Sequence, residues 1–191
     1  MAQTVGSPLR VYVDLEYCYP GMSKETGRPS ETDLRQVIQI AAIIWNTKTG
    51  SEEQSFDVLT HPAFEKQVPD FFTTLTGIQQ TTIDEEAILF PEALQSFVQF
   101  CDQYPIWTFN ADWGVLKQNC EYFNIPYPFE KKEFVRVKPL LSGWGIDSEQ
   151  YSSGTLHCAV GIKMDGHVHN ALHDVRSMAS AVQLLEQKTT T

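Results

Sequence analysis

Apolar residues form three short segments in the first third of the chain, and each is long enough for a strand. Residues 9–16 are rich in β-branched and aromatic side chains, and Pro20-Gly21 follows them, which predicts a strand that enters a polar loop extending to about Asp33. Residues 36–46 predict a second strand. After a short turn, residues 54–60 are expected to return antiparallel as the third strand.

The pattern changes to helical spacing after these strands. Apolar positions recur every three or four residues over 90–101, a helix that begins with a Pro, and a second helix is expected over 112–123. Residues 105–110 predict a fourth strand between them, and residues 134–138 predict a fifth strand or the start of a helix. The last helix is expected over 171–187. Its apolar side carries Leu172, Val175, Met178, Ala179, Val182 and Leu185. This order predicts an α/β domain with a mixed sheet.

The length of the chain limits the number of domains, and its net charge limits how it can bind nucleic acid. A chain of 191 residues with 42% apolar residues suits one domain, so residues 1–191 are taken as a single domain. The net charge of −10 argues against a broadly basic surface that grips nucleic acid. Carboxylates gathered around Mg²⁺ or Mn²⁺ would let such a protein meet phosphates locally, because a bound ion inverts the local charge. An acidic surface with no such role is the alternative.

The cysteines and the chain start indicate the compartment. The four cysteines lie far apart without a CxxC pair, so neither a zinc knuckle nor a disulfide framework is indicated. The first residues lack the pattern of a signal peptide, and no apolar run approaches the roughly 18 residues of a membrane span. We therefore expect a cytoplasmic protein with no membrane partner.

Acidic residues stand at the ends of predicted elements. Asp14 and Glu16 lie two apart at the end of the first strand, so both side chains share a face, and a cation would relieve the cost of placing two acids there. A solvated strand end is the equal alternative. Asp112 follows the fourth strand and Asp174 lies early in the last helix. Helix capping and the helix dipole are the simpler explanations for these two acids.

Residues 166–174 differ from the single acids above because they bring three histidines and an acid together at the predicted start of a helix. His169 precedes Asp174 by five residues, so its ring can lie over a metal that the carboxylate holds. An ordinary His pKa of about 6.5 suits a general base near neutral pH. We therefore interpret His169 as functional together with Asp174.

These residues carry a family resemblance. The chain resembles the DEDDh family of 3′-to-5′ exonucleases in four motifs that occur in the expected order: Asp14-Leu15-Glu16, Leu75-Thr76-Gly77-Ile78, Asn110-Ala111-Asp112 and the segment 169–174 with His169, Ala171 and Asp174. The resemblance covers about residues 9–187. Residues 134–138 and 143–145 look most like the Eri-like branch. The family implies an RNase H-like mixed five-stranded sheet flanked by helices.

The resemblance also implies a reaction. Asp14, Glu16, Asp112 and Asp174 would hold two divalent cations, Mg²⁺ or Mn²⁺, and His169 would take a proton from the attacking water. The expected substrate is the 3′ end of single-stranded RNA or DNA, or a short 3′ overhang, with RNA somewhat favoured. Nucleoside 5′-monophosphates would be released. The expected substrate-contacting residues are Tyr17, Leu75, Thr76, Ile78, Phe109 and Asn110.

Two other functions compete with this one. A non-catalytic module on the same fold would bind a nucleic-acid end or a protein, although it has no reason to keep costly clustered carboxylates. Alternatively, His169 and His173 would be zinc ligands at i and i+4 of one helix face. No Glu follows His169 as in an HExxH motif, and Asp14 and Glu16 would then lack a role.

Overall fold

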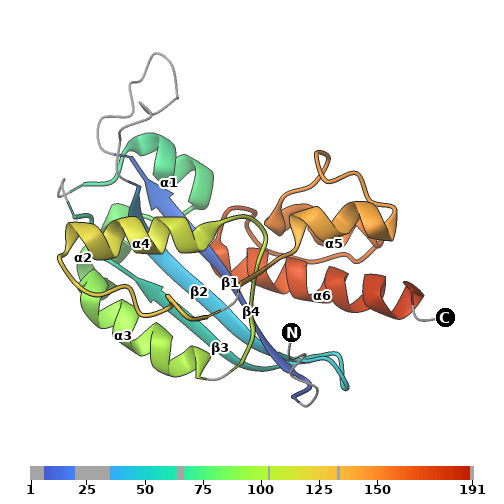
Figure 1. Ribbon diagram of the computed structural model, residues 1–191. Coiled ribbons are helices and arrows are strands. Elements are labelled where there is room, and N and C mark those ends of the chain that lie inside the picture. Colours follow the sequence, from blue (N-terminus) through green and yellow to red (C-terminus); the bar gives the residue numbers. More distant parts are fainter. Residues whose placement is uncertain (1–6, 20–34, 64–66, 103, 133, 190–191) are drawn as a thin grey trace.

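The described residues form a five-stranded mixed sheet. Figure 1 shows the helices that flank it. The computed structural model describes residues 7–19, 35–63, 67–102, 104–132 and 134–189. The strands are β1 (Leu9–Cys18), β2 (Gln36–Asn46), β3 (Ser51–Leu59), β4 (Ile106–Thr108) and β5 (Phe134–Arg136), in the spatial order β3-β2-β1-β4-β5. β1, β2 and β3 pair antiparallel, whereas β4 and β5 are parallel to β1. The expected fold class is confirmed.

The burial of each strand follows from its place in the sheet. β2 is buried over nearly its whole length, because it lies between β1 and β3 and helices cover both of its faces. β3 is the edge strand and is largely exposed. It begins at Ser51, three residues before the predicted start, because the turn at Gly50, with φ of 68°, lets Ser51 pair at once with Asn46. The polar residues at its start need no burial and gave no apolar signal.

Three long helices cover the sheet on its two sides, namely α3 (Phe90–Cys101), α4 (Asp112–Tyr122) and α6 (Ala171–Thr189). Figure 1 shows α3 and α4 on one side and α6 on the other. Phe90, Phe97 and Leu116 pack against one face of β1 and β2. Val175 and Met178 of α6 pack against the other face. Burying side chains of this size contributes roughly 1.5–3 kcal/mol each. The apolar side chains on the two sides of the sheet therefore hold the helices against it.

The described residues also form five short helical elements. Four of them had no counterpart in the sequence prediction, and the fifth begins at Lys138, within the residues 134–138 that were expected to form a strand or the start of a helix. The five elements are α1 (Asp70–Thr76), α2 (Gln80–Glu86), η1 (Lys138–Trp144), η2 (Ser153–Thr155) and α5 (Leu156–Ala159). Each spans only one or two turns, which is too short for an apolar period to show. The predicted polar loop up to about Asp33 lies largely outside the described residues. In the described part of the chain, no helix has the length and apolar character needed to cross a membrane.

Candidate active site

Two acidic side chains come from the central strand. Asp14 and Glu16 on β1 are each only 8% exposed, and the period of the strand places both on one face. β1 pairs Glu16 with Gln39 and then shifts register at the next residue, which marks a bulge. Bulges change the direction of a strand and often lie beside functional sites. The solvated strand end, the alternative for this pair, does not describe two buried carboxylates.

Asp112 joins this pair from the neighbouring strand. β4 runs parallel to β1 and pairs Val13 with Thr108, so both strands deliver their carboxyl ends to the same edge. Asp112 is the first residue of α4, and the N-cap position belongs to Ala111, so helix capping does not explain this acid. Asp112 Oδ2 is shielded from solvent and has no hydrogen-bond partner among the described residues. A buried carboxylate oxygen without a partner is costly, and a bound divalent cation would offset this cost, so Asp112 fits the role of a metal ligand.

Asp174 reaches the cluster from the first turn of α6 and is 2% exposed. Its carboxylate accepts two hydrogen bonds: Ser153 Oγ donates to Oδ2 over 3.1 Å, and the backbone nitrogen of His169 donates to Oδ1 over 3.2 Å. Gly154 packs so closely that a Cβ atom there would lie 2.3 Å from Asp174 Oδ1. The element η2 therefore fixes the direction of this carboxylate.

His169 lies two residues before the start of α6 rather than on the helix, and its φ of 68° is in the left-handed region. A ring nitrogen of His169 and carboxylate oxygens of Glu16 and Asp174 lie within 4.8 Å of one another. The ring of His173 instead contacts the carbonyl oxygen of Gly154, with its Nε2 3.2 Å away. His169 and His173 therefore do not share a helix face, and the zinc-pair hypothesis is wrong in that premise.

The carboxylates of the cluster have raised pKa values. The pKa of Asp14 lies well above its usual value because of burial and, next, the charges of Asp112, Asp174 and Glu16. Burial, followed by the charges of Asp174 and Asp112, raises the pKa of Glu16 to about 9. Burial also raises the pKa of Asp112 to about 7, although its own backbone N–H and two arginines oppose the shift. Oxygen ligands with this excess of negative charge fit hard divalent cations such as Mg²⁺ and Mn²⁺.

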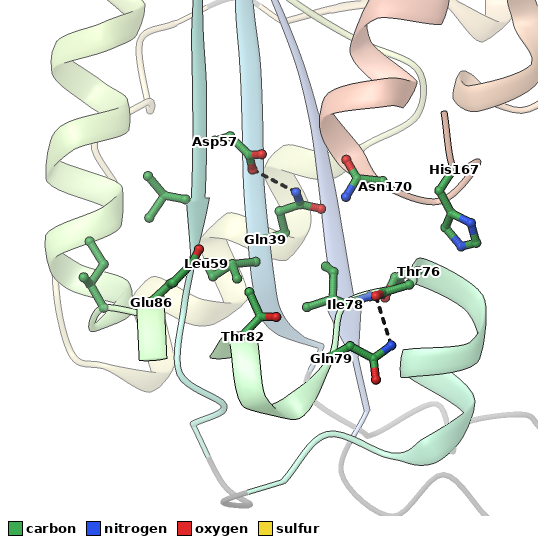
Figure 2. Close-up of a pocket in the computed structure, with 13 residues that line it drawn as sticks. Gln39, Asp57, Leu59, Thr76, Ile78, Gln79, Thr82, Glu86, His167 and Asn170 are labelled. Atoms are coloured by element: carbon green, nitrogen blue, oxygen red, sulfur yellow. Dashed lines mark hydrogen bonds between the residues drawn. The ribbon is translucent and has the colours of Figure 1, made fainter. Parts of the chain in front are cut away.

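A cavity of about 490 Å³ opens over the cluster and contains all four carboxylates and His169. Four of the predicted substrate-contacting residues also line it: Tyr17, Leu75, Phe109 and Asn110. Thr76 and Ile78 instead line a neighbouring cavity of about 500 Å³, shown in Figure 2. Both are buried, and Thr76 Oγ1 donates to the carbonyl of Phe72 over 2.9 Å. The structure thus brings Leu75 to the cavity of the carboxylates and places Thr76 and Ile78 at the neighbouring cavity.

Sequence reasoning missed several side chains of the acidic cavity. Phe71 lines it and is 54% exposed, and Tyr151 and Ser153 also line it. Phe71 lies four residues before the Leu75-Thr76-Gly77-Ile78 motif, and an aromatic residue so close to the motif is a signal that could have found it. Tyr151 and Ser153 lie in a segment with neither an apolar period nor a motif, so no sequence pattern indicates them.

Comparison with known proteins assigns the family. Residues 21–182 match the exonuclease family named for RNase T. The chain belongs to this exonuclease family. It is 25% identical over 175 residues to 3′-5′ exoribonuclease 1 of Homo sapiens, a match covering 85% of this chain and 49% of the relative. It is 22% identical over 179 residues to the 3′-5′ exonuclease Snipper of Drosophila melanogaster, covering 82% of this chain and 63% of that protein.

Solved structures of exonucleases share the fold. The nuclease domain of 3′hExo, a DEDDh family member bound to rAMP, superposes with a TM-score of 0.81 at 22% identity and covers 98% of this chain and 95% of that one. A complex of E. coli ExoI with single-stranded DNA gives a TM-score of 0.67 at 16% identity, covering 97% of this chain and 42% of ExoI. This exonuclease-family chain spans about half the length of the exoribonuclease 1 relatives.

Proposed function

We propose that the protein is a metal-dependent 3′-to-5′ exonuclease. One observation carries this proposal: four carboxylates from β1, α4 and α6 converge with His169 in a single cavity. A fold built only for binding gains nothing from acids whose burial raises their pKa. The acids are useful where divalent cations offset their charge, as the family assignment implies.

The chain's own residues divide the chemistry between them. Asp14, Glu16, Asp112 and Asp174 would hold two divalent cations. Such cations would lower the pKa of water and stabilise the attacking and leaving oxygens of an in-line displacement. His169 accepts the proton of the attacking water, a role typically worth about 10²–10⁴-fold in rate. A ring nitrogen of His169 lies within 4.8 Å of carboxylate oxygens of Glu16 and Asp174, which supports this role.

The walls of the cavity favour a single-stranded 3′ end. Aromatic rings of Tyr17, Phe71, Phe109 and Tyr151 line it, and base stacking on such rings is worth about 1–3 kcal/mol per base whatever the sequence. RNA is the favoured substrate because the curated relatives include exoribonuclease 1, and a structural neighbour is described as recognising the 3′ end of a histone mRNA stem-loop. The ExoI complex with single-stranded DNA keeps DNA as a second substrate to test.

The test is an assay of purified protein on end-labelled single-stranded RNA and DNA in Mg²⁺, Mn²⁺ or EDTA. We expect cleavage that requires the metal and is faster on RNA. Asp14→Asn keeps the shape of the side chain but removes ligand charge, so it should lower the rate by at least about 10²-fold. Tight binding of the 3′ end in Ca²⁺ without cleavage in Mg²⁺ or Mn²⁺ would contradict the enzyme and favour a binding module.

A further inference from the structure

Gln39 is a buried amide on the central part of the sheet that makes two long-range hydrogen bonds. It lies on β2 and is 2% exposed. Its Nε2 donates to Asp57 Oδ1 on β3 over 2.8 Å, and its Oε1 accepts from the backbone nitrogen of Ala171 over 3.0 Å. Figure 2 shows Gln39 lying between Asp57 and Asn170 at the start of α6. One side chain therefore connects the edge strand, the neighbouring strand and a helix.

The chemistry of the two partners fixes which way the amide points. An ionised carboxylate only accepts hydrogen bonds, and a backbone N–H only donates. Asp57 must therefore face the NH₂ group of Gln39, and Ala171 must face its oxygen. A side chain at position 39 has to donate at one end and accept at the other. Leucine does neither, and an ionised glutamate cannot donate.

The anchored nitrogen lies at a sensitive place in the chain. Ala171 is the first residue of α6, two residues after His169 and three before Asp174. His169 adopts a left-handed backbone conformation, which a residue with a Cβ atom adopts at a cost. Its backbone nitrogen is held by Asp174 Oδ1 over 3.2 Å. The hydrogen bonds at His169 and Ala171 therefore hold the two ends of the turn that presents the His169 ring.

We propose that Gln39 and Asp57 act as a positioning pair, in which Asp57 orients the Gln39 amide and Gln39 fixes the start of α6, so that His169 and Asp174 keep their places at the metal site. Neither residue lines the acidic cavity, so both act on the reaction through α6. This inference rests on the proposed exonuclease function. Partners that orient ligand-bearing elements are typically worth about 10- to 100-fold in activity or metal affinity.

Exchanging the two functional groups tests the pair. Gln39→Leu should lower kcat about 10- to 100-fold and leave KM within about twofold, because the cavity that holds the substrate is unchanged. Gln39→Glu faces one carboxylate with another and should also lower kcat. Asp57→Asn should have little effect, since the Asn oxygen still accepts from Gln39. The double variant Q39E/D57N reverses the donor and acceptor between the two residues and should recover most of the activity lost in Gln39→Glu.

Gln79→Leu is the matched control. Gln39 and Gln79 both line the neighbouring cavity shown in Figure 2. The Nε2 of Gln79, however, donates to the Gly77 carbonyl over 3.2 Å rather than contacting α6. Its kcat should equal that of the unaltered protein. Activity in Gln39→Leu equal to the unaltered protein, or a double variant no better than Gln39→Glu, would overturn the proposal. If Gln39→Leu does not fold, the comparison of Gln39→Glu with Q39E/D57N decides.

A second readout separates this inference from the proposed function. Amide hydrogen exchange over residues 167–175 should be faster in Gln39→Glu than in the unaltered protein and should return to its original rate in Q39E/D57N. This measurement needs no substrate. An inactive unaltered protein with the expected exchange pattern would refute the exonuclease and keep the positioning pair. An active protein whose exchange over 167–175 is the same in all variants would refute the pair alone.

Discussion

At the scale of single residues, the carboxylates of the acidic cavity oppose the folding of the metal-free protein. Burial raises the pKa of Glu16 from an ordinary 4.5 to about 9, and it raises the pKa of Asp14 as well. Between pH 4.5 and 9 the folded protein therefore holds protons that the unfolded chain has lost. By linkage, the free energy of unfolding must fall as pH rises across this window. Divalent cations should reverse this loss because they replace the protons.

The first prediction follows from this fall in the free energy of unfolding with rising pH. In EDTA the melting temperature should be lower at pH 8.5 than at pH 6, and Glu16→Gln should make the decline smaller because it removes the group whose pKa is raised to about 9. Adding Mn²⁺ at pH 8.5 should raise the melting temperature of the unaltered protein more than that of Glu16→Gln. Differential scanning fluorimetry measures both effects. A metal-free melting temperature that rises with pH, or a slope that Glu16→Gln leaves unchanged, would contradict the account.

Which site residues the sequence reveals depends on how local their signals are. Asp14 and Glu16 follow from the period of a strand, and the segment from His169 to Asp174 is visible as a cluster along the chain. Gln39 and Ser153 act through partners more than 20 residues away, Ala171 and Asp174 respectively. No pattern along the chain connects such pairs. The structure was needed to find them.

At the scale of secondary-structure elements, η2 and α6 hold the site as a packed pair. Ser153 Oγ donates to Asp174, and the carbonyl of Gly154 meets the ring of His173. The long helix was predictable because its apolar period extends over 171–187. The element η2 was not, since three residues of 3₁₀ helix carry no period. The direction of the Asp174 carboxylate thus depends on an element that the sequence did not indicate.

Gly154→Ala tests this packing. An added Cβ would lie 2.3 Å from Asp174 Oδ1, so either η2 or the carboxylate must move. We expect metal affinity and kcat to fall about 10- to 100-fold, as for other groups that orient metal ligands. Isothermal titration with Mn²⁺ measures the affinity.

The matched control is Gly114→Ala in α4, where an added Cβ meets nothing within 4 Å. Alanine is the better helix former by about 1 kcal/mol, so this change should leave metal affinity unaltered and raise the melting temperature slightly. Equal metal affinity in the Gly154→Ala and unaltered proteins would show that η2 does not orient Asp174.

At the scale of the whole molecule, an acidic protein has to hold an acidic substrate. The net charge is −10, and Lys138, which lines the acidic cavity, is paired with Glu149 over 3.1 Å. Cations in the site and stacking on aromatic rings should therefore supply most of the affinity, with few phosphates neutralised by lysine or arginine. The pattern of strands and amphipathic helices predicted the mixed α/β class, and the family resemblance implied the five-stranded sheet. The distribution of charge over the surface is a property of the folded chain.

The salt dependence of binding tests this balance. With Ca²⁺ in place of Mg²⁺ to prevent turnover, the slope of log affinity against log salt should be shallow, corresponding to roughly one to three phosphate contacts at about 0.7 each. Leu75→Ala should weaken binding of a single-stranded 3′ end more than any single change to alanine among Lys131, Lys132 and Lys138. A steep slope in which Lys131 and Lys132 dominate would show that a local basic groove holds the substrate.

The direction of degradation tests the central claim most directly. A 5′-labelled single-stranded RNA incubated with Mn²⁺ should shorten in single-nucleotide steps from its 3′ end and release nucleoside 5′-monophosphates, while a circular RNA of the same sequence stays intact. The Asp14→Asn protein should leave both RNAs unchanged. Cleavage of the circle, or release of the label as a 5′ mononucleotide before the chain shortens, would contradict a 3′-to-5′ exonuclease.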